Sequence, residues 1–171
     1  MRILLQRSRK IACGLAAAAL LVPAANAWAQ PACEWLNSAS AATLLGGLPE
    51  VKTLSANDED TMCSFTHQQG SSRAELRLTI TPAAHAARDA ATRTRDCMGS
   101  SMPLRGIGND ASRCDLRQTH GLHVEQITSR VRDRTFTLQW MQTTRPSSPA
   151  ARALQSEQFE RLARMIAGNL F

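Results

Sequence analysis

Four cysteines follow an N-terminal segment that has the features of an export signal. Of all the features in the sequence, these cysteines restrict the possible folds most. They are Cys33, Cys63, Cys97 and Cys114. An even number of cysteines in an exported chain indicates two disulfides. Of the three possible connectivities, pairing of sequence neighbours favours Cys33–Cys63 and Cys97–Cys114. The chain has no C-x-x-C spacing, which is typical of zinc and redox sites, so we expect these cysteines to be structural.

The first 29 residues have the anatomy of a secretory signal peptide. Basic residues between positions 2 and 10 precede an apolar run over 11–22, and small-residue cleavage patterns end at Ala27 and Ala29. We expect cleavage after one of these two alanines, whereas a retained anchor or a buried helix is the alternative. Cys13 precedes most of the apolar run and lacks an apolar box before it, so no lipid anchor is expected.

No second apolar span follows, so residues 30–171 are expected to form one disulfide-stapled domain without a transmembrane span, periplasmic or secreted. Four of the 20 basic residues and none of the 14 acidic residues lie in positions 1–29, which leaves the remainder near +2. The chain has no tyrosine and few other aromatic residues. This charge and composition argue against nucleic-acid binding.

The first half of the domain reads as a helix followed by two strands. Asn37 and Ser38 can cap a helix over 39–45, which Gly46 and Gly47 would end. Residues 61–67 and 73–81 alternate between apolar and polar side chains. In the second strand the predicted inward side chains are those of Ala74, Leu76, Leu78 and Ile80. This pattern is typical of a half-buried antiparallel strand.

The second half predicts helices on either side of three further strands. We expect Pro82 to open an alanine-rich helix over 83–98 that ends at Gly99. Strands are expected over 111–118, 122–129 and 135–141, followed by an amphipathic helix that Ser148 caps and Pro149 begins. The order predicts an α+β fold: a mainly antiparallel sheet of about five to six strands with helices packed on its face or faces.

Two short motifs suggest binding sites. Gly106-Ile107-Gly108-Asn109-Asp110 resembles part of a phosphate loop, but it lacks the third glycine, the following lysine and the following helix, so we expect a structural turn. His120 and His123 are weak metal candidates, because residues three apart on a strand point to opposite faces. We therefore expect no metal and no cofactor.

No catalytic constellation is evident in the sequence. There is no G-x-S-x-G, and the cysteines outside the signal are expected to be oxidised. His67 or His85 could partner Asp89, but a histidine and an acid four apart on a helix more often form a solvated contact. Glu157 and Glu160 are expected on the polar side of the last helix. We expect no catalytic residues.

Several segments together resemble a known family. Cys33-Glu34-Trp35-Leu36, a short helix ending Leu44-Leu45-Gly46-Gly47, and Cys63-Ser64-Phe65 are similar to the start of a large family of uncharacterised exported actinobacterial proteins, many of them lipoproteins. Residues 104–111 and the helix over 159–170 fit the same family. The resemblance implies a PsbP-like sandwich and a Cys33–Cys63 bridge. The chain departs from the family in lacking a lipobox and in having Cys97 and Cys114.

The resemblance brings no established activity, so the functional hypotheses follow from the residues. The leading one is an exported non-enzymatic binding module that acts on a protein partner of the cell envelope, such as an inhibitor or immunity-type protein. The alternative is a small-ligand or envelope-component binding protein, with Trp35, Trp140 and Met141 lining a cleft between sheet and helices. The third hypothesis is an enzyme of unknown class, for which His120 and His123 are the best candidate residues.

Overall fold

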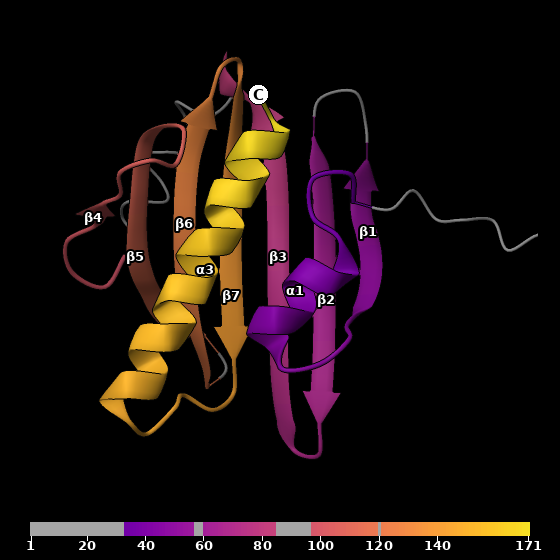
Figure 1. Ribbon diagram of the computed structural model, residues 1–171, viewed down its shortest axis with the longest axis vertical. Helices are drawn as coiled ribbons and strands as arrows, with labels where there is room; N and C mark the ends of the chain where they lie inside the picture. Colours follow the sequence, from indigo (N-terminus) through magenta and orange to yellow (C-terminus); the bar gives the residue numbers. More distant parts are fainter. Residues whose placement is uncertain (1–32, 57–59, 85–96, 120) are drawn as a thin grey trace, which may run out of the picture.

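The computed structural model describes residues 33–56, 60–84, 97–119 and 121–171. The predicted signal peptide over 1–29 lies outside these residues. The chain forms one seven-stranded sheet in the order β1-β2-β3-β7-β6-β5-β4, with antiparallel pairing throughout (Figure 1). The elements are α1 Ser38–Leu45, β1 Glu50–Ala56, β2 Thr61–Gln69, β3 Ser72–Pro82, β4 Met102–Pro103, β5 Asn109–Thr119, β6 Leu122–Val131, β7 Arg134–Gln142 and α3 Pro149–Asn169.

This architecture confirms an α+β fold with an antiparallel sheet, and it corrects the strand count. The sequence indicated about five to six strands, whereas the sheet has seven. The two strands without a clear sequence signal, β1 and β4, are the two edges of the sheet. Edge strands have less of their surface buried, so their sequences show a weaker alternation.

Both helices begin where the capping residues predict. The Asn37 side chain accepts a hydrogen bond from the Ser40 N–H at the start of α1, at 2.8 Å. The Ser148 hydroxyl accepts one from the Ala151 N–H at the start of α3, at 3.1 Å. Gly46 ends α1 with φ 80°, a left-handed conformation that glycine adopts without strain.

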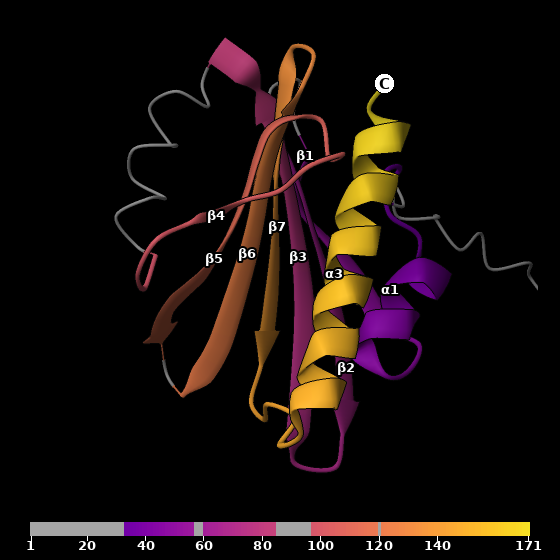
Figure 2. The ribbon, with the colours of Figure 1, turned by 60° about the vertical axis from the view of Figure 1, so that its left-hand side comes forward.

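The core lies between the two helices and one face of the sheet. Figure 2 shows α1 and α3 on the same side of the strands. The sheet supplies fully buried side chains in cross-strand pairs, such as Leu78 opposite Leu138 and Leu76 opposite Trp140, and α3 supplies Phe159. The Trp140 and Phe159 ring centroids are 5.9 Å apart. Helices and sheet therefore share a single apolar layer.

The predicted helix over 83–98 is wrong at its C-terminal end. Pro82 is the last residue of β3, where it pairs with Arg134. Cys97 forms an isolated antiparallel bridge with Leu116, and the Met98 N–H donates to the Asp115 carbonyl oxygen at 2.7 Å. Residues 83–84 are helical, and 85–96 lie outside the described residues. Pairing with β5 overrides the alanine-rich helical pattern at its C-terminal end.

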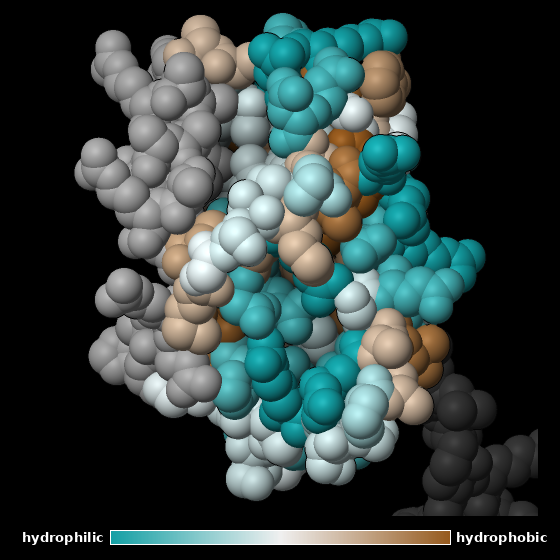
Figure 3. All heavy atoms as spheres, turned by 90° about the vertical axis from the view of Figure 1, so that its left-hand side faces the viewer, coloured by the Kyte–Doolittle hydropathy of each residue, from teal (hydrophilic) through white to brown (hydrophobic). Residues whose placement is uncertain are grey.

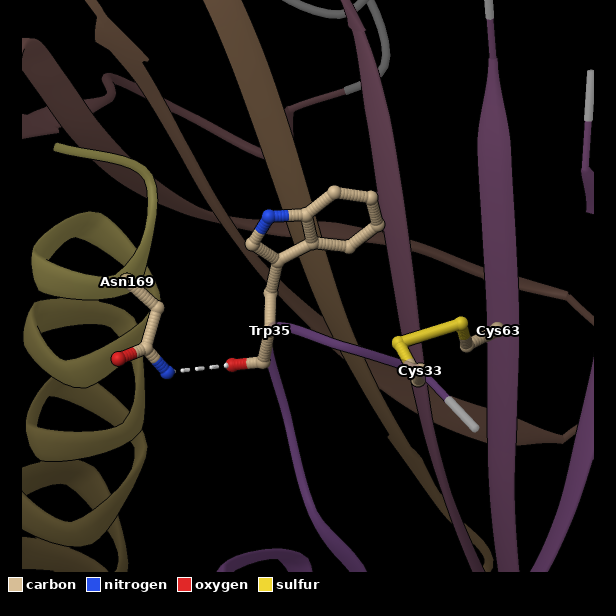
Figure 4. The surroundings of a disulfide bond; sticks show 4 residues. All are labelled: Cys33, Trp35, Cys63 and Asn169. Atoms are coloured by element: carbon tan, nitrogen blue, oxygen red, sulfur yellow. Dashed lines mark hydrogen bonds between the residues drawn. A yellow bond between two sulfur atoms is a disulfide. The ribbon is translucent and has the colours of Figure 1, made fainter. Parts of the chain in front are cut away.

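The structure has the two disulfides that the pairing of sequence neighbours favours. Cys33 bonds to Cys63 and Cys97 bonds to Cys114, with Cα–Cα distances of 6.1 and 5.6 Å. Figure 4 shows the first bridge beside the side chain of Trp35. Strand alternation places Cys63 on the helix-covered face and Cys114 on the opposite face. One covalent bond therefore lies on each side of the sheet.

The surface at the β4–β5 side is mostly hydrophilic. Figure 3 shows the described atoms there largely in teal and white, with brown in small patches. In the described part of the chain, neither helix combines the length and the apolar character needed to cross a bilayer.

Candidate functional site

The glycine-rich loop packs as part of the fold. Ile107 is fully buried, and its carbonyl oxygen accepts a hydrogen bond from the Ser129 hydroxyl at 2.7 Å. Gly106, Gly108 and Asp110 all have positive φ, at 74°, 53° and 56°. The loop turns the chain into β5 and holds it against β6, as expected of a structural turn.

A methyl group at Gly108 is expected to destabilise the protein by about 2–3 kcal/mol, because it combines left-handed strain with overpacking. The added Cβ would lie 2.5 Å from the Arg130 carbonyl oxygen and 2.7 Å from the Ser129 hydroxyl. Gly106→Ala is the matched control, since its Cβ would meet nothing within 4 Å. Urea unfolding measures the free energy of unfolding of both variants. Equal losses of stability in the two variants would contradict the steric explanation.

The histidine candidates form no metal site that the structure describes. His123 lies half-buried on β6, whereas His120, His85 and Asp89 fall outside the described residues. No group of three or more His, Cys, Asp or Glu side chains within the described ranges could hold a metal ion. The enzyme hypothesis that uses both histidines stays untested.

The three residues predicted to line one cleft are separated. Trp140 lies on the helix-covered face of β7, so its neighbour Met141 lies on the other face. Trp35 precedes α1, near the first disulfide (Figure 4), and its carbonyl oxygen accepts a hydrogen bond from Asn169 Nδ2 at 3.0 Å. Of the three, only Trp140 lines a described hollow between sheet and helices.

A charged cluster under α3 joins the helix to the sheet. The Arg113 guanidinium donates to Glu125 on β6 and to the Ser156 hydroxyl on α3. Its Cζ atom lies 5.9 Å from the centroid of the Phe159 ring. Both Arg113 and Glu125 have side chains about nine-tenths buried, at 11% and 12% exposed. Glu160 lies 3.4 Å from Arg113, although the sequence placed it on the polar side. Because these carboxylates are paired with arginines, we interpret the cluster as structural.

A second cluster lies on the opposite face of the sheet, around Glu75. Its carboxylate accepts hydrogen bonds from the side chains of Ser64, Arg73 and Arg77, at 2.8–3.0 Å. Burial raises the pKa of Glu75, but the hydrogen bonds from Arg77 and Ser64 and the charges of Arg77 and Arg73 outweigh it. The net pKa is below the ordinary value of a glutamate.

Protonation of Glu75 at low pH is therefore expected to lower the free energy of unfolding. A carboxyl group with a lowered folded pKa contributes stability above its unfolded pKa and loses it as the pH falls through the folded value. Urea unfolding between pH 7 and pH 3 should show the free energy of unfolding declining below about 4.5, the ordinary pKa of the group. Glu75→Gln should be less stable at pH 7 and show a shallower decline. If the free energy of unfolding of Glu75→Gln fell with pH as steeply as that of the unaltered protein, this role of Glu75 would be contradicted.

A cavity of about 190 Å³, here called the hairpin-end pocket, lies where the β2–β3 hairpin meets the ends of α1 and β7 and the first turns of α3. Polar side chains of His67, Gln69, Trp140, Gln142 and Gln155 line it. Trp140 is 2% exposed, and its indole Nε1 is buried without a hydrogen-bond partner among the described residues. An unmet buried donor costs roughly 1–3 kcal/mol, so it is a feature that needs an explanation.

A second hollow of about 540 Å³, here called the inter-helix groove, lies between α1 and α3. Its lining residues are Ser40, Thr43, Gln158, Arg161, Leu162 and Met165. The α3 residues follow the i, i+3, i+4, i+7 spacing of one helix face, a signal that the sequence contains. Leu162 and Met165 form an apolar floor, and the Ser40 hydroxyl lies 3.5 Å from the Met165 sulfur across it.

Comparisons with protein-family models, with curated proteins and with solved structures find no match for this chain. The resemblance to the exported actinobacterial family therefore stays a prediction. The features of the described structure that bear on function are the two hollows and the charges around them.

Proposed function

We propose that the protein is an exported, non-enzymatic binding module, and that it binds an acidic amphipathic segment of a protein partner in the inter-helix groove. The single observation that carries the proposal is this groove of about 540 Å³, with an apolar floor and a polar rim. An apolar centre with a polar rim is the usual anatomy of a protein interface. Side chains of two helices, α1 and α3, line the groove, and an amphipathic peptide helix can bind in such an apolar groove.

The chemistry of the lining favours an acidic partner. Arg161 is exposed at the rim, and it has no ion-pair partner in the part of the chain that the structure describes. No acidic residue lines the groove. Met165 adds a flexible thioether, a side chain that adapts to the shape of bound apolar residues. An inhibitor or immunity-type role in the cell envelope is consistent with such a surface.

Site-specific photo-cross-linking tests this proposal in cells that export the full protein. A photoreactive residue at Gln158, in the groove, should give one defined adduct, whereas the same residue at the exposed Asp133 in the β6–β7 turn should not. Mass spectrometry of the cross-linked peptide should identify an acidic amphipathic segment.

Charge removal supplies the matched control. Arg161→Ala should reduce the Gln158 adduct severalfold, whereas Arg164→Ala, one helical turn away and outside the groove lining, should not. Equal adducts at Gln158 and Asp133, or an adduct insensitive to Arg161, would overturn the proposal. Absence of any adduct would do the same.

A further inference from the structure

We propose that two copies of the protein form a symmetric dimer by pairing their β1 strands antiparallel, edge to edge. β1 lies at one edge of the sheet and, among the described strands, pairs with β2 alone (Figure 1). An edge strand presents a row of backbone N–H and C=O groups with which another strand can pair. No residue of β1 lines the inter-helix groove, so this inference does not rest on the proposed function.

The two edges of the sheet differ in their capacity for such pairing. β4, at the opposite edge, has only two residues, Met102 and Pro103, and a proline has no N–H to donate. β1 has seven residues and no proline. Its first three residues pair regularly with β2, and its bulge lies further along the strand. β1 is therefore the edge better suited to accept another strand.

The charges of β1 are complementary to those of a second copy. If Val51 of both copies lies at the two-fold axis, Glu50 of each copy lies opposite Lys52 of the other. Opposite charges directly across two strands stabilise their pairing, whereas like charges weaken it. An axis at Glu50 or at Lys52 would place like charges opposite each other. The charges therefore favour the register centred on Val51.

Both charged side chains are accessible to a second copy. Glu50 and Lys52 are 67% and 62% exposed, and they lie on the same face of β1. Within one chain their side chains form an ion pair at 3.0 Å. An exposed pair of this kind contributes little to stability, so exchanging it for two pairs between the copies costs little.

Two exposed leucines fit the same register. Leu48 and Leu54 are 76% and 50% exposed, and each is three positions from Val51. With Val51 at the axis, Leu48 of each copy lies opposite Leu54 of the other. Pairing would remove apolar surface from water at both ends of the contact, which is favourable. A single register therefore matches the charges and the apolar side chains, and a two-fold contact of this kind closes at two copies.

Analytical ultracentrifugation of the exported protein tests the inference. The concentration should rise to about 1 mM, because a short strand contact can bind weakly. The unaltered protein should show an equilibrium between monomer and dimer. Glu50→Lys and Lys52→Glu each place like charges opposite each other at two positions, so each should raise the dissociation constant of the dimer about tenfold or more. Circular dichroism checks that both variants are folded.

A mixture of the two variants identifies the register. Glu50→Lys in one copy and Lys52→Glu in the other restore opposite charges at both positions, so the mixture should dimerise about as tightly as the unaltered protein. Arg130→Glu is the matched control, because it reverses one charge of an exposed pair on β6 and should leave dimerisation unchanged. A monomer at every concentration, a dimer that neither variant weakens, or a mixture that stays monomeric would overturn the proposal.

Discussion

Reduction of both disulfides is expected to lower the free energy of unfolding by about 6–7 kcal/mol. Cys33 and Cys63 are 30 positions apart and Cys97 and Cys114 are 17 apart. Loop-closure entropy gives about 3.5 kcal/mol for the longer loop and about 3 kcal/mol for the shorter one. Since small domains have a total stability of roughly 5–15 kcal/mol, we expect the reduced protein to be largely unfolded at 37 °C.

Urea unfolding of the oxidised and reduced protein, followed by circular dichroism, measures this loss. Paired replacements then separate the two bridges. Cys33→Ala with Cys63→Ala should cost more than Cys97→Ala with Cys114→Ala, because the first loop is longer and both of its cysteines are buried, whereas Cys97 is half-exposed. A reduced protein that keeps its stability, or the reverse order of the pairs, would contradict this account.

Replacement of Arg113 by methionine is expected to destabilise the protein by about 3–5 kcal/mol, the usual cost of leaving one charge of a buried pair without its partner. Arg113 connects β5 to Glu125 on β6 and to Ser156 and Glu160 on α3. Arg145 lies 3.5 Å from Glu125 and would still offset part of its charge, so a value near the lower end is expected. Urea denaturation at neutral pH measures the change.

A double variant separates the lost charge from the lost contact. Arg113→Met with Glu125→Leu should recover most of the stability, because well-packed apolar residues replace a buried ion pair with little net cost. Arg164→Met is the control, since that arginine forms an exposed pair with Glu160 four residues earlier and should change stability by less than about 0.5 kcal/mol. Comparable losses for Arg113→Met and Arg164→Met would contradict the structural role of the cluster.

The elements with strong local signals could be predicted from the sequence. The alternation over 73–81 identified β3 and its buried face, and the aromatic and aliphatic alternation over 135–141 identified β7. The caps of α1 and α3 follow from Asn37 and from Ser148 with Pro149. In each case the side chains that decide the structure are neighbours in the sequence.

Elements that depend on distant partners could not be predicted in this way. Residues 97–98 continue an alanine-rich helical pattern, but they pair with Leu116 and Asp115 on β5. β1 presents Leu54 half-exposed at the sheet edge, so its apolar residues do not mark a buried face. Local propensity is a weak prior when another strand offers hydrogen bonds.

The candidate site was only partly visible in the sequence. Trp140 was expected in a cleft between sheet and helices, and it lines the hairpin-end pocket. The prediction that Trp35 and Met141 line the same cleft is wrong, because neither residue lines this pocket. The glutamines of the pocket come from β2, β7 and α3, and nothing in their spacing brings them together. Their meeting requires the register that places Ala74 opposite both His67 and Gln142.

The position of β3 beside β7 has a consequence for the folding rate. β3 ends at Pro82 and β7 begins at Arg134, so the two halves of the sheet meet in a pairing between distant parts of the chain. Both disulfides lie within a half, and neither crosses this pairing. Closing a long loop is slow relative to forming hairpins. We therefore expect the oxidised chain to form two meanders first and to fold at the rate at which they join, so that Leu78→Ala at the junction slows refolding measured by stopped flow.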